Sequence, residues 1–241
     1  MAHYDTPVEV RPLERLILGF SSECGRNPMT VFEDFLAYVI HGFSPGAPPL
    51  KSWKYKRNQN AEFMRMFCEW LSLMKSTLDG GKEWYDALGE LYTAFASTSG
   101  RSAQGQFFTP PPVCDLMAAC TANNGSQQGA RASDPTCGSG RLLLAYHVRN
   151  LGCYLVGEDI DRTCCMMSVC NMLVHGCVGE VVWHDSLRPG TFSGGWYVNP
   201  FLTRTGIPSI RIMTENEYKN NDKMPSPTLR QNGIRTKIQT L

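Results

Sequence analysis

Apolar residues recur at helical spacing through the first hundred residues of the chain. Between Thr30 and His41 they fall on one face of a helix, and Gly42 ends this pattern. The same spacing returns from Asn60 to Leu78 and from Lys82 to Ser97. Three amphipathic helices of this length predict a small all-α domain over residues 1–100, with its aromatic and methionine side chains in the core.

The pattern changes after a polar linker. Short apolar stretches now alternate with helical patterns, and each stretch ends in an acid. Alternating strands and helices predict a parallel sheet with right-handed crossovers, so we expect an α/β domain over residues 101–210. The predicted strands are Ala130–Asp134, Tyr154–Asp159 and Glu180–Asp185, and the predicted helices are 112–122, 141–151 and 161–175.

Beyond Asp185 the periodic pattern weakens. Trp196–Phe201 is a strand candidate with little alternation, and the chain is polar and aperiodic from Tyr218 onward. Residues 211–241 are therefore predicted to form a polar tail.

Composition narrows the class of protein. Hydrophobic residues make up 42% of the chain and charged residues 19%, which is typical of a globular protein with a core. The N-terminus carries charges where a signal peptide is apolar, and no apolar stretch spans a bilayer, so we expect a cytoplasmic protein without membrane contact. Ten cysteines include no Cys-x-x-Cys pair, so we expect no metal site and interpret most cysteines as reduced core residues.

The net charge of +1 neither demands nor excludes nucleic acid as a partner. The basic and aromatic segment Lys51–Arg57 suits either a contact with phosphates or an ordinary solvated surface.

A glycine-rich turn, Asp134-Pro-Thr-Cys-Gly-Ser-Gly140, joins the first predicted strand to a helix. Its two glycines let the backbone approach a ligand closely, and the following helix aims free N–H groups at it. The strand-end acid can counter an ammonium group or accept hydroxyl donors. Leu143 stands where a dinucleotide fingerprint has its third glycine. The alternative is an ordinary tight strand-to-helix turn.

Two further acids follow the next two strands. Asp159 stands where nucleoside-binding folds hold ribose hydroxyls, while Asp161 is placed to cap the following helix. Asp185 follows the third strand, where a carboxylate could accept a proton from an exocyclic amine. Each acid alone is equally explained by capping or solvation. Three acids at successive strand ends lie along one edge of the sheet, where ligands bind.

Four motifs together resemble a known family. In chain order they are QGQFFTP at Gln104–Pro110, DPTCGSG, GEDID and HDSL, and they resemble the N-6 adenine-specific DNA methyltransferases. Within that family they are most similar to the modification subunits of type I restriction-modification systems. The resemblance covers residues 10–190. It implies a Rossmann-like S-adenosylmethionine-dependent sheet after a helical domain, DNA as the substrate, and a separate specificity subunit as a partner.

The resemblance also assigns cofactor contacts. In this family the Phe-Thr-Pro loop and the glycine turn enclose the methionine end of S-adenosylmethionine. The acid after the second strand holds the ribose, its neighbour packs on the adenine, and the acid after the third strand contacts the adenine amine. The implied cofactor residues are Phe107, Phe108, Thr109, Pro110, Asp134, Cys137, Gly138, Gly140, Asp159, Ile160 and Asp185.

The family's catalytic motif is Asn-Pro-Pro followed by an aromatic residue. The Asn side chain and a proline carbonyl accept hydrogen bonds from the target amine, and the ring stacks on the flipped adenine. Asn199, Pro200 and Phe201 correspond to it, with one proline fewer. The missing residue moves the ring by about 3 Å and turns it to the other side of the backbone. In the family, the sheet continues with further strands after this motif. In this sequence 40 residues follow Phe201, and they show no alternation typical of strands.

Three functions follow from these residues. The first is adenine-N6 methylation of DNA. The second is a catalytically weak or inactive methyltransferase-like protein that binds cofactor, DNA or a partner subunit. The third is methylation of another target, since similar motifs serve protein glutamine methylation, although the helical domain and the GQFFTP loop argue against it.

Overall fold

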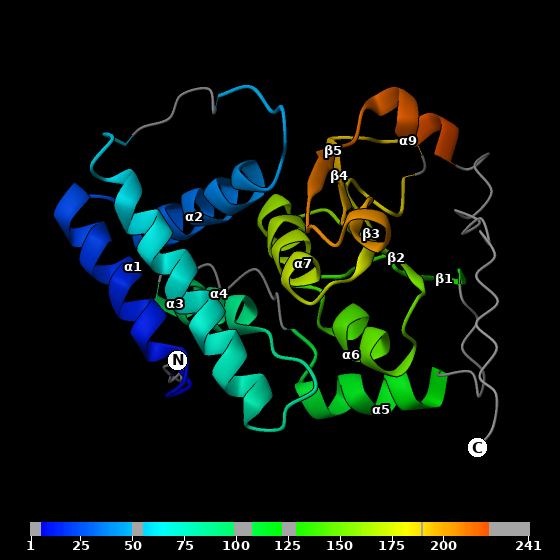
Figure 1. Cartoon of the computed structure of the whole chain (residues 1–241), viewed down its shortest axis with the longest axis horizontal. Coiled ribbons are helices and arrows are strands. Elements are labelled where there is room, and N and C mark those ends of the chain that lie inside the picture. The colour runs from blue at the N-terminus through cyan, green and yellow to red at the C-terminus, as the bar shows by residue number, and fades with distance from the viewer. Residues whose placement is uncertain (1–5, 50–54, 99–107, 122–128, 189, 222–241) are drawn as a thin grey trace, which may run out of the picture.

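The computed structural model describes residues 6–49, 55–98, 108–121, 129–188 and 190–221 (Figure 1). The helices in these ranges are α1 (Arg11–Cys24), α2 (Pro28–Gly42), α3 (Asn60–Asp79), α4 (Ala87–Thr98), α5 (Pro111–Thr121), α6 (Arg141–Arg149), α7 (Arg162–Val174), α8 (Leu202–Thr205) and α9 (Glu215–Asn221). The strands are β1 (Arg131–Asp134), β2 (Tyr154–Asp159), β3 (Val178–Trp183), β4 (Gly194–Val198) and β5 (Ile210–Ile212).

Helices α1 to α4 precede the sheet, and their boundaries follow local signals. Gly25 ends α1 in the left-handed conformation, with φ of 64°. The Asn27 side chain caps α2 by accepting a hydrogen bond from the Met29 N–H at 2.9 Å. The predicted helices at α2, α3 and α4 are confirmed, and α1 is a further helix that the prediction omitted. Their apolar faces meet in an aromatic core, where the Phe35 and Trp70 rings pack edge to face.

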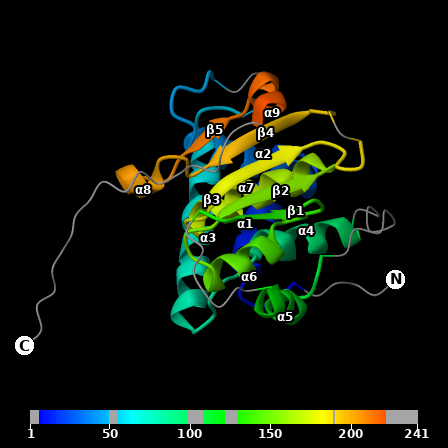
Figure 2. The ribbon, with the colours of Figure 1, turned by 90° about the vertical axis from the view of Figure 1, so that its right-hand side faces the viewer.

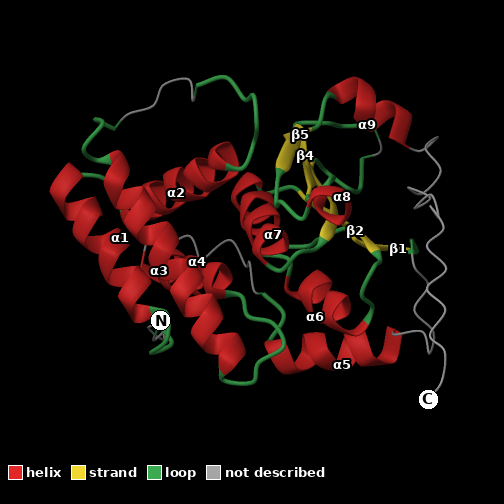
Figure 3. Ribbon diagram, in the orientation of Figure 1, coloured by secondary structure: helices red, strands yellow, loops and turns green. Residues whose placement is uncertain are grey.

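The sheet has five strands in the order β1-β2-β3-β4-β5, which is also their order along the chain. β1, β2 and β3 run parallel, as predicted, whereas β4 and β5 are antiparallel to their neighbours. The fold is therefore mixed α/β (Figure 3). The chain reverses between β3 and β4, so β4 returns along the outer edge of β3.

Both helices between the parallel strands pack on the same face of the sheet. A Cβ at Gly157 would lie 3.2 Å from Leu143 of α6, and one at Gly179 would lie 2.9 Å from Met172 of α7. The opposite face carries Tyr154 and Glu180. The Tyr154 phenol donates a hydrogen bond to the Glu180 carboxylate at 2.8 Å. Figure 2 views the sheet with α2 and α7 behind it.

One hydrophobic core runs through the helices and the sheet. It includes Phe35 and Trp70 as well as Leu155 and Val181. The predicted boundary near residue 100 falls among residues 99–107, and most of the predicted tail falls among residues 222–241, both outside the described residues. The division into residues 1–100, 101–210 and 211–241 stays a prediction. In the described part of the chain, no helix is both long and apolar enough to cross a membrane.

Candidate cofactor site at the carboxyl end of the parallel strands

The glycine turn after β1 requires glycine at two positions. Gly138 has φ of 53° and Gly140 has φ of 90°, conformations that other residues rarely adopt. A Cβ at Gly138 would lie 2.9 Å from the Phe108 ring, and a Cβ at Gly140 would lie 2.8 Å from the Ser168 hydroxyl. The turn is therefore closely packed from two sides by other parts of the chain.

The end of β2 is hydrogen-bonded to this turn. One Asp159 oxygen, Oδ2, accepts the Gly138 N–H at 2.9 Å, and the other accepts the Asp161 N–H at 2.8 Å. The Cys137 N–H donates to the Glu158 carbonyl at 2.8 Å. Asp161 caps α7, as predicted, by accepting the Thr163 N–H at 2.7 Å. The first two strand-end acids thus lie at one edge and share the same turn.

The acids at this edge hold a proton more readily than free carboxyls. Burial raises the pKa of Asp134, and the neighbouring carboxylates Asp159 and Glu158 raise it further. Burial likewise raises the pKa of Asp159, although the backbone N–H groups of Asp161 and Gly138 oppose this. An edge with this charge gains from a cationic ligand, which would stabilise both ionised carboxylates.

A cavity of about 280 Å³ opens beside the turn. Phe108, Thr109, Asp134 and Gly138 are among the residues that line it. Five predicted cofactor residues meet there: Phe108, Thr109, Asp134, Cys137 and Gly138. Pro110 is exposed just before α5, and Phe107 lies outside the described residues. Burial raises the pKa of the Cys137 thiol well above its ordinary value, so it stays protonated and packs as a small core residue.

Apolar side chains project from the next two strand ends. Ile160 is 67% exposed and Leu187 is 89% exposed, although large aliphatic residues are usually buried. The Trp183 indole donates to the Ile160 carbonyl at 3.0 Å and holds this loop at the end of β3. Asp185 accepts the Leu187 N–H at 3.0 Å, and Arg188 lies 3.4 Å from its carboxylate. This part of the edge therefore offers apolar surface beside the carboxylates of Asp159 and Asp185.

Three buried charged residues beside the turn were missed by the sequence analysis. They are Asp86, Glu90 and Arg141. Arg141 forms an ion pair with each of the two carboxylates, and it lines the cavity. The available signal was charge at or next to the start of helices with apolar character, because charged side chains are rarely buried. Among the described residues, no group of three or more His, Cys, Asp or Glu side chains is arranged to hold a metal ion.

The predicted catalytic residues lie at the other end of the sheet. Val198 pairs with Gly179 near the start of β3, whereas Gly194 pairs with Trp183 at its end. The five residue steps from Gly194 to Asn199 span about 16 Å at roughly 3.3 Å per residue. The structure therefore does not bring Asn199, Pro200 and Phe201 to the edge that carries the acids, because β4 runs antiparallel to β3.

Asn199 has extensive contacts where it stands. It is fully buried and has φ of 54°. Its amide nitrogen donates to the carbonyls of Cys177 at 2.9 Å and Leu173 at 3.2 Å, and its amide oxygen accepts the Ser209 N–H at 3.2 Å. These contacts satisfy backbone groups where α7 ends.

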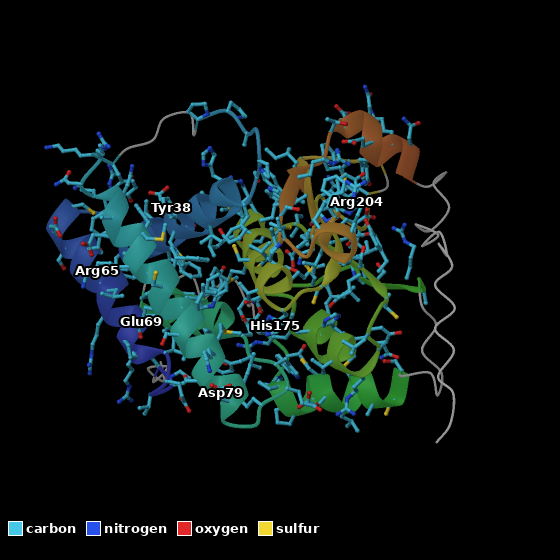
Figure 4. All side chains as sticks on the ribbon, viewed as in Figure 1. Tyr38, Arg65, Glu69, Asp79, His175 and Arg204 are labelled. Carbon is cyan, nitrogen blue, oxygen red and sulfur yellow. The ribbon has the colours of Figure 1, made fainter. Side chains whose placement is uncertain are left out.

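The two residues after Asn199 lie closer to the surface. Phe201 is 45% exposed, and the guanidinium of Arg204, which is labelled in Figure 4, lies over its ring at 5.2 Å. The catalytic role of Asn199, Pro200 and Phe201 stays a prediction.

Residues 83–200 match the family model described as N-6 DNA Methylase. This part of the chain belongs to the N-6 DNA methylase family. The matched segment of this N-6 DNA methylase domain includes α4, the glycine turn and all three strand-end acids. The family predicted from the sequence motifs is thereby confirmed.

A solved structure is also similar to this chain. It is the type I restriction-modification system methyltransferase subunit from Streptococcus thermophilus, with 20% identity and a TM-score of 0.37. The alignment covers 79% of this chain and 44% of that subunit, so the chain spans less than half the length of that protein. A comparison with curated proteins gives no match.

Proposed function

We propose that this chain binds S-adenosylmethionine across the carboxyl ends of β1, β2 and β3 and takes part in adenine-N6 methylation of DNA. The observation behind the proposal is the hydrogen bond between Asp159 and the Gly138 turn, within a domain of the N-6 DNA methylase family. The three parallel strands would be the cofactor half of a Rossmann-like methyltransferase sheet. Residues 1–100 would be the preceding all-α domain, and residues 211–241 would be a polar tail.

The cavity suits the methionine end of the cofactor. Asp134 would pair with the ammonium group, and the turn at Gly138 would let the ligand lie close to the backbone. Phe108 and Thr109 would shield this end from water. When bound, S-adenosylmethionine supplies an activated methyl group on a positively charged sulfur. The surplus of carboxylates at this edge favours such a cation.

The exposed aliphatic side chains suit the nucleoside end. Ile160 would pack on the adenine ring, and Asp185 would accept a hydrogen bond from the adenine amine. Asp159 would accept from the ribose hydroxyls. Each of its oxygens already accepts one backbone N–H, and an ionised carboxylate has further acceptor sites for the ribose.

The position of Asn199 favours a second candidate, which is a catalytically weak or inactive methyltransferase-like protein. In the proposed reaction this residue would hold the target amine, together with the Pro200 carbonyl and the ring of Phe201. Its amide instead donates to the Cys177 carbonyl inside the protein. Such a protein would act by binding cofactor, DNA or a partner such as a specificity subunit.

Calorimetric titration of the full chain with S-adenosylmethionine tests cofactor binding. We expect saturable binding that weakens in D134N and D159N, because each loses a negative charge at the site. Asp79, which is exposed at the end of α3 and is not among the residues that line the cavity, provides the matched control D79N, which should bind like the parent (Asp79 is labelled in Figure 4). Absence of binding by the parent chain would reject the proposed cofactor.

Transfer of labelled methyl groups separates the two candidates. The acceptors are unmethylated DNA of diverse sequence and the same DNA already methylated at adenine N6. Label that enters only the unmethylated DNA, at adenine N6, supports the enzyme. Cofactor binding without incorporation supports the second candidate, and incorporation into protein instead of DNA would reject both.

A further inference from the structure

A cluster of buried charges connects α4 to the cofactor cavity. Asp86, Glu90 and Arg141 are 2%, 9% and 7% exposed. The Arg141 guanidinium donates through Nε to Asp86 at 2.6 Å and through Nη2 to Glu90 at 2.8 Å. Asp86 immediately precedes α4 and caps it by accepting the Gly89 N–H at 2.7 Å. One arginine therefore binds two carboxylates that the start of α4 holds in place.

Asp86 also contacts the glycine turn and α7. The Ser139 hydroxyl donates to its Oδ2 at 2.5 Å, and the Asn171 amide donates to its Oδ1 at 2.7 Å. Asn171 donates as well to the Ser139 carbonyl at 2.9 Å. A single carboxylate thus joins α4, the turn between the two glycines, and α7. The chain segments concerned are more than 30 residues apart in sequence.

The cluster continues to the cavity wall through Arg141. Its guanidinium carbon lies 5.3 Å from the centroid of the Phe108 ring, within reach of a cation–π interaction. The Tyr92 ring of α4 packs on Phe108 as well, with centroids 5.6 Å apart. Phe108 also lies so close to Gly138 that a Cβ there would clash at 2.9 Å. Phe108 therefore packs against α4, Arg141 and the glycine turn.

Burial of three charges is a costly way to stabilise a fold. Desolvation of buried ions offsets much of their attraction, and apolar residues of similar shape often stabilise a protein equally well. Arginine here offers two things that apolar residues lack, which are a planar fork for two carboxylates and a flat cation for an aromatic face. The fork binds Asp86 and Glu90, and the flat face of the guanidinium lies over Phe108.

We propose that Asp86, Glu90 and Arg141 are positioning residues that hold Phe108 against Gly138 and so set the shape of the methionine end of the cavity. The identity of the ligand rests on the proposed function. The three residues act through the packing of Phe108 on the glycine turn, and Arg141 also lines the cavity.

The test uses R141K and F108L, singly and together, in the full chain. Lysine keeps the charge but loses the planar fork and the stacking surface. We expect R141K to weaken S-adenosylmethionine binding by about tenfold or more, equivalent to roughly 1.4 kcal/mol. Because Arg141 acts through Phe108, the double variant should bind little more weakly than F108L alone. Multiplying effects in the double variant would overturn the proposal.

Arg131 provides a matched control on the opposite face of the sheet. It pairs with Glu180 at 2.8 Å and lies over the Tyr154 ring at 5.0 Å, so R131K removes a similar arrangement away from the cavity. R131K should leave affinity within about twofold of the parent. The neutral triple variant D86N/E90Q/R141M removes every charge of the cluster together. Cooperative unfolding would show that this variant is folded, and its affinity for S-adenosylmethionine should be lower than that of the parent chain. An affinity equal to that of the parent would overturn the proposal.

Hydrogen exchange in the ligand-free protein separates this proposal from the proposed function. Loss of the cluster should speed amide exchange in the turn at Gly138 by about tenfold in R141K and leave it unchanged in R131K. This outcome supports the positioning role even where the parent chain binds no S-adenosylmethionine. Equal exchange at Gly138 in the parent and R141K would overturn it.

Discussion

Replacing Asn199 separates a structural role of this residue from a catalytic one. In N199A the amide disappears from a fully buried site where it donates to the Cys177 carbonyl and accepts the Ser209 N–H. In N199D the side chain keeps its size, but an oxygen replaces the donor that faces the carbonyls. If the residue served only to hold a target amine, neither change would affect folding.

The structure gives the size of the expected loss. The Cys177 carbonyl and the Ser209 N–H each lose the Asn199 side chain as a partner, at a cost of about 1–3 kcal/mol each. Alanine in the left-handed conformation adds roughly 1 kcal/mol. The free energy of unfolding should therefore fall by at least about 3 kcal/mol, against a typical total of about 5–15 kcal/mol. For a chain of this length that corresponds to a decrease in melting temperature of at least about 6 °C.

Urea unfolding followed by far-ultraviolet circular dichroism measures this loss, with thermal melts beside it. N216A, which removes an exposed asparagine on α9, should change stability by less than about 0.5 kcal/mol. Stability of N199A and N199D within error of the parent would refute the structural role derived from these contacts. Loss of methyl transfer in variants of unchanged stability would restore the catalytic assignment.

Three further predictions concern the cofactor edge. Since burial raises the pKa of Asp134 and Asp159, S-adenosylmethionine should bind more tightly as the pH rises from roughly 4 to 7, and calorimetry should find this dependence flattened in D134N. In G138A the new Cβ would clash with Phe108, so affinity should fall at least about tenfold, whereas G25A, with similar φ but open space, should change only stability. I160A should weaken binding by roughly 1 kcal/mol without changing the melting temperature. L151A, equally exposed but away from the edge, should change neither the affinity nor the melting temperature. Equal affinities of I160A and the parent chain would refute the adenine contact.

Local signals were sufficient for most of the elements near the site. Asp161 sits before α7 with the side chain that helix starts prefer, and the apolar run of β2 has the predicted boundaries, Tyr154–Asp159. Periodicity was less reliable for single faces. Most cysteines were interpreted as core residues, and within helical patterns Cys170 is buried whereas Cys68 and Cys120 are exposed.

Features that depend on distant partners could not be predicted. Nothing local in Gly194–Val198 indicates that this strand pairs with β3 in the antiparallel sense, and that pairing decides where Asn199 lies. Likewise Asp86 and Arg141 are 55 residues apart, and neither belongs to a recognisable motif. Strand order and buried ion pairs are decided by packing between elements, which sequence spacing does not record.

The agreement between strand order and chain order has a consequence for how the sheet assembles. Each strand pairs with the strand synthesised just before it, so no pairing waits for a later segment. Topologies built from such neighbouring contacts fold faster than those that need distant strands to meet. We expect the sheet to grow from β1 outward as the chain is made. The strand ends at Asp134 and Asp159 would then be in place before β4 forms. β4 and β5 would add to a sheet whose proposed cofactor edge has already formed.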